Sequence, residues 1–304
     1  MVIRNFADLV EQAKRCPPQR VVVAGTENET VLKAVHQAQH EGFAHPVLVG
    51  LPKSEDAGRR FFAQYADFVA VETPDEADIA AEAVSLIPRN QGDILLKGSV
   101  STAALMRAVL DKGSGLSVSG LLSDSFLFED ARRSGNQLID ITDGGVVLYP
   151  DVQQKQAILE NAVRVYHALG HSKPKVAICA AIEKVNEQMP ATVDAAELHR
   201  RYRAGEITGC IVDGPLALDV ALSKDALRLK GLESELDGEA DILVMPSIEA
   251  ANLMAKSVQY IAGKEAAHVI MGAGVPLLIP SRSDTARGKY LSIALAVVVS
   301  TEQV

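Results

Sequence analysis

Short apolar runs that alternate with helical segments most constrain how this chain can fold. Residues 20–25 form the first run, residues 29–41 an amphipathic segment, and residues 46–50 a second apolar run. A strand, a helix and a strand joined by connections of this length form a unit with parallel strands. The alternation resumes over residues 152–299, so the sequence predicts an α/β protein.

The composition supports this fold class and excludes some functions. Hydrophobic residues make up 48% of the 304 residues and aromatic residues only 4%, which is typical of layered α/β cores. A net charge of -9 argues against a general nucleic-acid-binding protein. No apolar stretch is long enough to span a membrane, no signal pattern precedes the first helix, and the three cysteines cannot all pair. We therefore expect a cytoplasmic protein with neither a membrane nor a nucleic-acid partner.

The middle of the chain departs from the alternation. After a Gly/Ser-rich segment over residues 113–120, apolar runs follow at residues 121–128, 137–142 and 146–149 with no helix between them. Short strands separated by turns are typical of an antiparallel element. The sequence thus predicts a small antiparallel insertion or edge and a domain boundary here.

The most informative local pattern is the end of an apolar run near the C-terminus. Residues 276–279 are bounded by proline and are followed by Ser281, Arg282 and Asp284. Ligands of parallel sheets bind just beyond the carboxyl ends of strands, and a guanidinium suits a phosphate or a carboxylate. We predict half of an anion-binding active site here, with Asp284 as a candidate base. The alternative is a polar turn that only follows a strand.

A second strand end carries a loop of small residues. The loop consists of Lys97, Gly98, Ser99, Val100, Ser101 and Thr102, and a helix with Arg107 on its second turn follows. Unpaired N–H groups and the dipole at a helix start favour an anion. Arg107 can reach the same point, because helical side chains lean toward the N-terminus. Alternatively, Ser101 or Thr102 only caps the helix and Lys97 is a solvated charge.

Two further strand ends carry weaker patterns. Asp213 and Asp219 flank a turn, where they could bind a cation, position a ligand or cap a helix. Asn252 and Lys256 are four residues apart and share a helix face, which could line a cleft or face solvent. No cysteine-based cluster or phosphate-binding glycine loop of known pattern occurs, so we predict no metal site.

Several motifs occur in a specific order along the chain. They include residues 96–98, 105–110, 139–145, 158–162 and 212–219, Glu249 with Asn252 and Lys256, and residues 281–284. In this order they resemble the phosphate acetyltransferase and phosphate butyryltransferase family, and the chain is closer to the butyryl branch. The resemblance implies reversible transfer of a butyryl, propionyl or acetyl group between coenzyme A and inorganic phosphate. Coenzyme A would be a substrate, and no cofactor would be bound.

The resemblance also implies an architecture and roles for individual residues. We expect a two-domain α/β/α sandwich like that of isocitrate and isopropylmalate dehydrogenases, with the active site in the interdomain cleft and a homodimeric or larger assembly. The first domain would comprise residues 1–142 plus 283–304, and the second residues 143–282. By motif match, Arg107, Ser281 and Arg282 fall on phosphate- and acyl-handling positions.

Two departures from the family pattern leave alternatives open. Acetyl-branch members carry a catalytic carboxylate seven residues after the motif serine, where this chain has Gly288, so the base would be Asp284. Ala251 stands where the family has glycine, and its methyl group could obstruct a close backbone approach. A catalytically weakened or regulatory protein that binds coenzyme A or acyl phosphate is therefore one alternative. A nicotinamide- and metal-dependent dehydrogenase of the same fold is the other.

Overall fold

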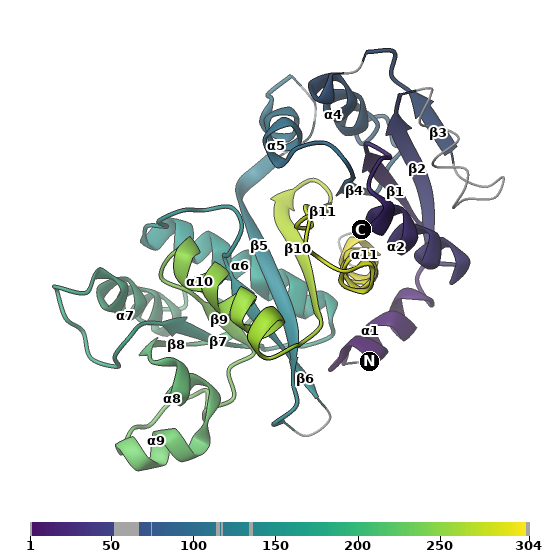
Figure 1. Cartoon of the computed structure of the whole chain (residues 1–304). Helices are drawn as coiled ribbons and strands as arrows, with labels where there is room; N and C mark the ends of the chain where they lie inside the picture. The colour runs from purple at the N-terminus through teal and green to yellow at the C-terminus, as the bar shows by residue number, and fades with distance from the viewer. Residues whose placement is uncertain are drawn as a thin grey trace. The chain divides into compact units, whose positions relative to one another are not determined.

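The computed structural model describes residues 2–51, 67–73, 75–113, 116, 118–133 and 136–301. It has an α/β fold, as the sequence predicts (Figure 1). The contacts within the chain separate into two compact units. We call residues 6–120 and 266–304 the terminal unit, and residues 1–5 and 121–265 the central unit.

These units divide the chain at other positions than the expected domains. Strand β6 (Gln137–Thr142) pairs in parallel with β9 (Ile242–Val244), which assigns the segment before residue 143 to the central unit. Strand β11 (Leu277–Leu278) pairs with β4 (Ile94–Lys97), which assigns the segment before residue 283 to the terminal unit. The units defined by contacts therefore change at residues 6, 121 and 266, and the expected domain bounds at residues 143 and 283 stay a prediction.

The terminal unit contains a mostly parallel run of strands. Its order is β3-β2-β1-β4-β11-β10, and only β10 runs antiparallel to its neighbour β11. The further bounds are β1 Gln19–Ala24, β2 Ala44–Gly50, β3 Asp67–Ala70 and β10 Ala266–Ala273. Strand β4 and most of β1 are buried, which explains why they read as continuous apolar runs.

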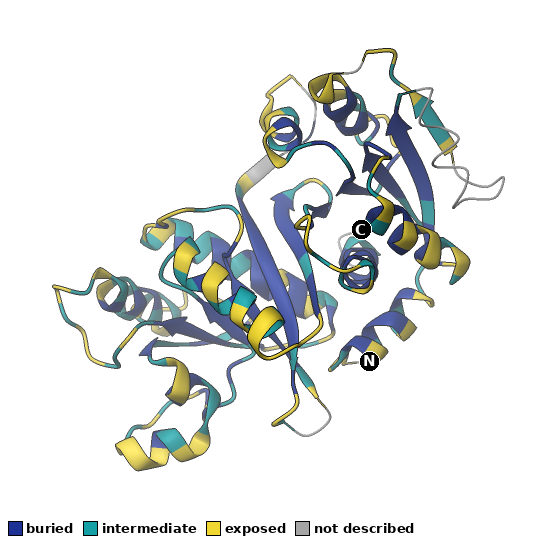
Figure 2. Cartoon of the chain, in the orientation of Figure 1, coloured by how far each residue is buried: buried dark blue, intermediate teal, exposed yellow. Residues whose placement is uncertain are grey.

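A helix at the end of the chain forms the centre of this unit. The helices are α1 Phe6–Ala13, α2 Glu29–His40, α4 Glu76–Ser85, α5 Thr102–Leu110 and α11 Ala286–Thr301. Helix α11 contacts α1, α2 and β10, and residues 289–299 are all buried (Figure 2). A helix that is enclosed on every side is apolar all round, and this segment is so apart from Lys289 and Ser292.

The central unit combines an antiparallel pair with parallel strands. Its order is β5-β6-β9-β7-β8, where β5 (Val118–Asp130) and β6 are antiparallel, as the sequence predicts. The remaining bounds are β7 Lys175–Cys179, β8 Ile211–Leu216, α6 Val152–Ala168, α7 Pro190–Arg203, α8 Leu218–Leu222, α9 Lys224–Lys230, α10 Ile248–Lys256 and the π-helix η2 Ser257–Ile261. Figure 1 shows α10 and α6 on opposite faces of these strands.

The apolar run at residues 146–149 is a loop and not a strand. The carboxylate of Asp143 accepts hydrogen bonds from the N–H groups of Gly145, Val146 and Val147 at 2.8–3.1 Å. These groups are therefore not available to a sheet ladder.

Two further expectations concern the whole molecule. Across the described ranges, no helix has the length and apolarity needed to cross a membrane. The closer comparison with isocitrate and isopropylmalate dehydrogenases, and the location of the site in a cleft, stay predictions.

Candidate functional site

Two of the predicted site segments follow neighbouring strands of the terminal unit. Leu278 of β11 lies opposite Leu96 of β4, and the two strands are parallel. The carboxyl ends of parallel strands meet at one edge of a sheet. Lys97, the last residue of β4, and the segment from Ser281 to Asp284 therefore emerge at the same edge.

The segment from Ser281 to Asp284 is a tight turn closed by its own carboxylate. The backbone N–H of Ser281 donates to Oδ2 of Asp284 at 2.7 Å, and the N–H of Asp284 donates to the carbonyl oxygen of Ser281 at 3.2 Å. The Nε2 atom of His268 lies 3.5 Å from the same carboxylate oxygen. The turn thus fixes Asp284 and leaves Ser281 and Arg282 exposed.

Lys97 and Arg282 bring two positive charges to this edge. Lys97 is only 5% exposed, and its side-chain ammonium forms no hydrogen bond or ion pair with the part of the chain that the structure describes. Burial lowers the pKa of Lys97 and the charge of Arg282 lowers it further, whereas Glu76 and Asp284 offset part of this effect. Arg282 is exposed and likewise has no ion-pair partner among the described residues. A positive charge without an ion-pair partner attracts an anion.

The loop after Lys97 offers fewer free N–H groups than the sequence predicts. The N–H groups of Gly98 and Ser99 donate to the carbonyl oxygens of Ala24 and Gly25 at 3.0 and 3.2 Å. A side chain at Gly98 would collide with the carbonyl oxygen of Gly25, so this close approach requires glycine. Gly98 and Ser99 therefore join β4 to β1, and their N–H groups are not available to an anion.

Ser101 caps the helix, which was the alternative to anion binding in the sequence analysis. Its Oγ accepts a hydrogen bond from the N–H of Ala104 at 3.2 Å, which caps α5. The N–H of Ser101 itself donates to Oε2 of Glu76 at 2.9 Å. The N–H groups of Thr102 and Ala103 have no partner in the described ranges, so two donors remain at this helix start.

Arg107 lies in the terminal unit together with Lys97 and Arg282. It is an exposed residue of α5 and has no ion-pair partner among residues with described positions. It is therefore free to bind an anion. Its convergence with Arg282 on one phosphate stays a prediction.

The sequence analysis missed two charged residues near this edge. Glu76 begins α4 and interacts electrostatically with Arg282 and Lys97. Lys289 of α11 is 1% exposed and donates to the carbonyl oxygen of Asp284 and to Oγ1 of Thr30, each at 2.7 Å. A lone lysine within an apolar helix was a signal for Lys289, but Glu76 had no local signal.

The candidates of the central unit form internal contacts instead. Oδ2 of Asp213 accepts a hydrogen bond from Ser234 at 2.5 Å, and its Oδ1 lies 3.0 Å from Nδ1 of His199. Nδ2 of Asn252 donates to the carbonyl oxygen of Gly144 at 3.1 Å. Lys256 donates to Gln259 at 3.2 Å. Local structure thus accounts for the side-chain contacts observed at Asp213, Asn252 and Lys256.

The two departures from the family pattern have distinct surroundings. Ala251 is fully buried, and its methyl group faces Gly144, which leaves space for it because it has no side chain. Gly288 lies in the first turn of α11, and its carbonyl oxygen accepts a hydrogen bond from Ser292 at 2.9 Å. Ala251 is therefore accommodated by its neighbour, whereas Gly288 supplies no carboxylate.

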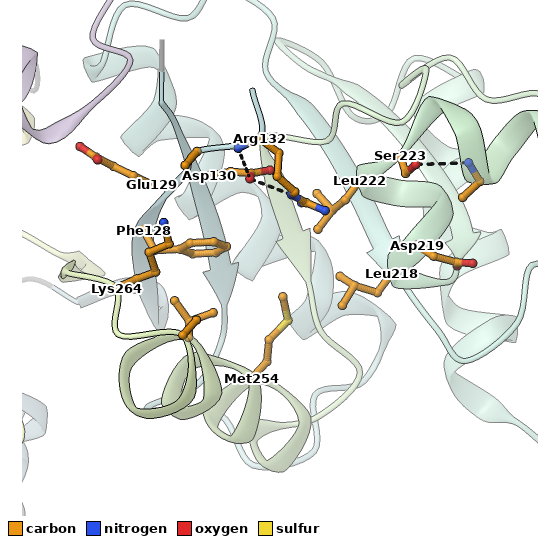
Figure 3. A pocket seen from close by; sticks show the side chains of 14 residues that line it. Phe128, Glu129, Asp130, Arg132, Leu218, Asp219, Leu222, Ser223, Met254 and Lys264 are labelled. Atoms are coloured by element: carbon orange, nitrogen blue, oxygen red, sulfur yellow. Dashed lines mark hydrogen bonds and ion pairs between the residues drawn. The ribbon is translucent and has the colours of Figure 1, made fainter. Parts of the chain in front are cut away.

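Each unit also contains a cavity. A groove of about 720 Å³ in the central unit is lined by apolar side chains such as Phe128, Leu222 and Met254 (Figure 3). Arg132 lies beside it and pairs with Asp130 at 2.8 Å. A cavity of about 160 Å³ in the terminal unit is lined by nine residues, among them Gly25, Thr26, Glu27, Glu76, Ser99 and Val100. None of the described residues form a group of three or more His, Cys, Asp or Glu suited to a metal ion.

The central unit also contains buried carboxyl groups that the sequence analysis did not single out. Asp140 of β6 is 0% exposed, and burial raises its pKa to about 8. Burial, with the charge of Asp124, raises the pKa of Asp143 to about 6. These groups lie among strands and turns, so we expect them to affect stability and not chemistry.

Comparisons with known proteins agree over nearly the whole chain. The family described as "Phosphate acetyl/butaryl transferase" matches residues 63–297. A phosphate butyryltransferase of Clostridium acetobutylicum is 37% identical over 98% of this chain and 99% of its own. A phosphate acetyltransferase of Thermotoga maritima is also 37% identical, over 95% and 98% respectively. The crystal structure of a branched-chain phosphotransacylase from Enterococcus faecalis superimposes on this chain with a TM-score of 0.80 and 29% sequence identity. The superposition covers 93% of this chain and 99% of that one.

Proposed function

The chain belongs to the phosphate acetyl/butyryl transferase family, and we propose that the cations at the ends of β4 and β11 carry its reaction. The reaction is the reversible transfer of a short-chain acyl group between coenzyme A and inorganic phosphate. We propose butyryl, propionyl and acetyl groups as the acyl chains. The membership confirms the resemblance of the motifs and disfavours the dehydrogenase alternative.

The observation that supports these roles is the presence of two cations without ion-pair partners at adjacent strand ends. Lys97 is a buried point charge, and Arg282 is an exposed planar group that suits two phosphate oxygens. In our proposal they bind inorganic phosphate in one direction and the phosphoryl group of acyl phosphate in the other. Their charges would stabilise the phosphate as it leaves the carbonyl carbon. Arg107 would add a third positive charge to the same anion.

Thiol attack on acyl phosphate needs a base, and we propose Asp284 for this role. The coenzyme A sulfur forms a bond to the carbonyl carbon, the bond to the phosphate oxygen breaks, and the thiol proton passes to the carboxylate. The N–H of Ser281 holds the carboxylate in place at 2.7 Å, which supports a fixed geometry. The hydroxyl of Ser281 would donate to an oxygen of the substrate.

The surroundings of the reaction are also proposals. Coenzyme A would act as a substrate with no resident cofactor, and the three free cysteines support a cytoplasmic location. A homodimer or larger assembly is supported by exposed apolar side chains on α10 and η2. Leu253 is 68% exposed and Ile261 84% exposed. Asp213, Asn252 and Lys256 would support the substrate site only through the local structure that they stabilise.

The direct test is release of free coenzyme A from acetyl-, propionyl- and butyryl-coenzyme A on addition of inorganic phosphate. We expect phosphate-dependent release from at least one of them. Arg282→Ala should lower kcat/KM by about 100-fold or more, because it removes a charge that the transition state needs. Arg89→Ala is the matched control, since Arg89 is an exposed arginine of the same unit that pairs with Glu82. No release from a broad panel of acyl-coenzyme A would contradict the function, and unchanged kinetics of Arg282→Ala would remove that residue from it.

A catalytically weakened relative is the second candidate, and Gly288 favours it. The acetyl branch has a carboxylate at this position, and here no side chain replaces it. Such a protein would bind coenzyme A or acyl phosphate tightly and release no coenzyme A. Calorimetric binding without turnover would select this candidate.

A further inference from the structure

Three lysines of the described chain are buried, and one of them differs from the other two. Nζ of Lys155 lies 2.6 Å from a carboxylate oxygen of Asp194, and Nζ of Lys289 donates to two oxygens at 2.7 Å each. The ammonium of Lys97 has neither an ion pair nor a hydrogen bond among the described residues. Of the three nitrogens, that of Lys97 is therefore the one that the described chain leaves available to a ligand.

The position of Lys97 lets a ligand reach this nitrogen. Nζ is not among the fully buried side-chain atoms that lack a partner, so the tip of the side chain reaches solvent although its stem is buried. Lys97 ends β4, and Leu96 before it lies opposite Leu278 of β11. The parallel register therefore places Lys97 at the sheet edge from which Ser281 and Arg282 emerge.

The surroundings of Lys97 favour a nucleophilic amine. Burial and the charge of Arg282 lower the pKa of Lys97, whereas Glu76 and Asp284 offset part of this effect. A lower pKa raises the fraction of neutral amine at a given pH, and the neutral amine is the form that attacks a carbonyl carbon. The carboxylate of Asp284 accepts a hydrogen bond from the N–H of Ser281 and does not hold the ammonium in an ion pair.

The proposed function brings an acyl donor to this amine. Lys97 and Arg282 bind the phosphoryl group of acyl phosphate in that proposal, and one bridging oxygen joins the phosphorus to the carbonyl carbon. A donor bound beside a nucleophile reacts in an effectively unimolecular step, which is much faster than a chance encounter. Acyl phosphate at this edge therefore meets two nucleophiles, the thiol of coenzyme A and the amine of Lys97.

We propose that Lys97 is a self-acylation site, at which its amine attacks the carbonyl carbon of an acyl phosphate bound at Arg282. The bond between nitrogen and carbon forms, the bond between carbon and the phosphate oxygen breaks, and one proton of the neutral amine passes to the phosphate. The products are an uncharged amide at Lys97 and inorganic phosphate, so no further reactant is needed. The inference rests on the proposed function, because it takes acyl phosphate to bind at this edge.

The experiment is incubation of the full chain with acetyl phosphate or butyryl phosphate at neutral pH, without coenzyme A, followed by mass spectrometry of its peptides. Lys155 is a buried but paired control, and Lys112 of the same unit as Lys97 is exposed and pairs with no described residue. We expect Lys97 to be acylated at least about tenfold faster than either control with one or both donors. Inorganic phosphate should slow acylation of Lys97 and not of Lys112, because it competes for the proposed anion site.

A variant tests the part that Arg282 plays. Arg282→Ala should slow acylation of Lys97 by about tenfold, because it removes both the group that holds the donor and a charge that favours the neutral amine. Arg89→Ala is the matched control, since Arg89 is an exposed arginine of the same unit that pairs with Glu82, and it should leave the rate unchanged.

Three results would overturn the inference. They are acylation of Lys97 no faster than that of Lys112, no protection by inorganic phosphate, and an unchanged rate in Arg282→Ala. Release of coenzyme A is measured separately, so the two proposals can fail independently. Release with an unmodified Lys97 would overturn self-acylation and leave the proposed function standing. Preferential, phosphate-sensitive acylation of Lys97 without release would contradict the proposed function and leave this site intact.

Discussion

Two lysines that are buried to the same extent show how the two units differ. Lys155 of α6 in the central unit is 4% exposed, and its Nζ lies 2.6 Å from Oδ2 of Asp194. Lys97 in the terminal unit is 5% exposed and has no such partner among the described residues. The stem of Lys97 is buried, but its Nζ is not among the fully buried side-chain atoms that lack a partner, so the tip of this side chain reaches solvent. A charge that is largely removed from water and has no ion-pair partner still costs free energy. We infer that a bound phosphate compensates for Lys97.

The same difference extends to the other polar residues at strand ends. Asp213 and Asn252 of the central unit are engaged by Ser234 and Gly144. Arg107 and Arg282 of the terminal unit have no ion pair within the described part of the chain. Polar residues that follow a strand therefore serve different purposes in the two units. What distinguishes these residues of the two units is whether the side chain has a hydrogen-bond or ion-pair partner, and not how deeply it is buried or where it lies relative to the strand.

The largest expected effect comes from replacing each buried lysine by methionine. Lys97→Met should lower kcat/KM for phosphate-dependent release of coenzyme A by about 100-fold. It should leave the free energy of unfolding unchanged or raise it by up to about 2 kcal/mol, because it removes an uncompensated charge. Lys155→Met should do the opposite, since it leaves Asp194 without its partner. We expect a loss of about 1–3 kcal/mol of stability and unchanged activity.

Urea unfolding and steady-state kinetics on the two variants measure both quantities. The comparison fails if Lys97→Met is the less stable variant, or if the two variants lose activity equally. A Lys97→Met protein that retains normal activity would show that Lys97 does not contribute to the reaction.

The strand ends of the terminal unit could be predicted from the sequence because their signal is local. An apolar run followed by Ser281, Arg282 and Asp284 predicts both a buried strand and the polar edge beyond it. The same holds for Lys97 after β4. The order of the motifs then predicted the family correctly, although no single motif was specific enough.

Contacts between distant segments could not be predicted in this way. Glu76 reaches Ser101 from another helix, and Asp213 meets His199 and Ser234 across gaps of 14 and 21 residues. The unit boundaries depend on the pairing of β11 with β4, which joins residues about 180 apart. Local patterns indicate which residue types follow a strand, but only the fold determines which of them find a partner.

A smaller effect is expected from the buried carboxyl group of Asp140 in the central unit. Burial raises its pKa to about 8, from an ordinary value of 3.8 for an aspartate side chain. Between these pH values the folded chain holds a proton that the unfolded chain has lost, so stability falls as pH rises through this range. The slope contributed by one such group is at most about 1.4 kcal/mol per pH unit. Asp140→Asn should flatten this slope, whatever its effect at a single pH.

Urea unfolding between pH 5 and 9 measures the slope for both proteins. Asp130→Asn is a control with the opposite sign. Burial favours the neutral form of Asp130, but the hydrogen bonds and charge of Arg132 outweigh burial and lower its pKa. Asp130→Asn should lose stability at neutral pH. Above pH 5 its unfolding free energy should depend on pH as steeply as that of the unmodified protein. Parallel slopes for Asp140→Asn and the unmodified protein would contradict the assignment.

The smallest effect concerns two serines with the same local role in different units. Ser101 caps α5 in the terminal unit and Ser247 caps α10 in the central unit, and each Oγ accepts a hydrogen bond from the N–H three residues later. Replacing either serine by alanine should cost about 1 kcal/mol of unfolding free energy, because one helix donor loses its partner. Only Ser101→Ala should also raise the KM for phosphate, by about threefold, since fraying of α5 disturbs the N–H groups of Thr102 and Ala103 beside the cations. Equal KM values in the two variants would show that the start of α5 contributes nothing to phosphate binding, which would leave Lys97 and the arginines as the whole site.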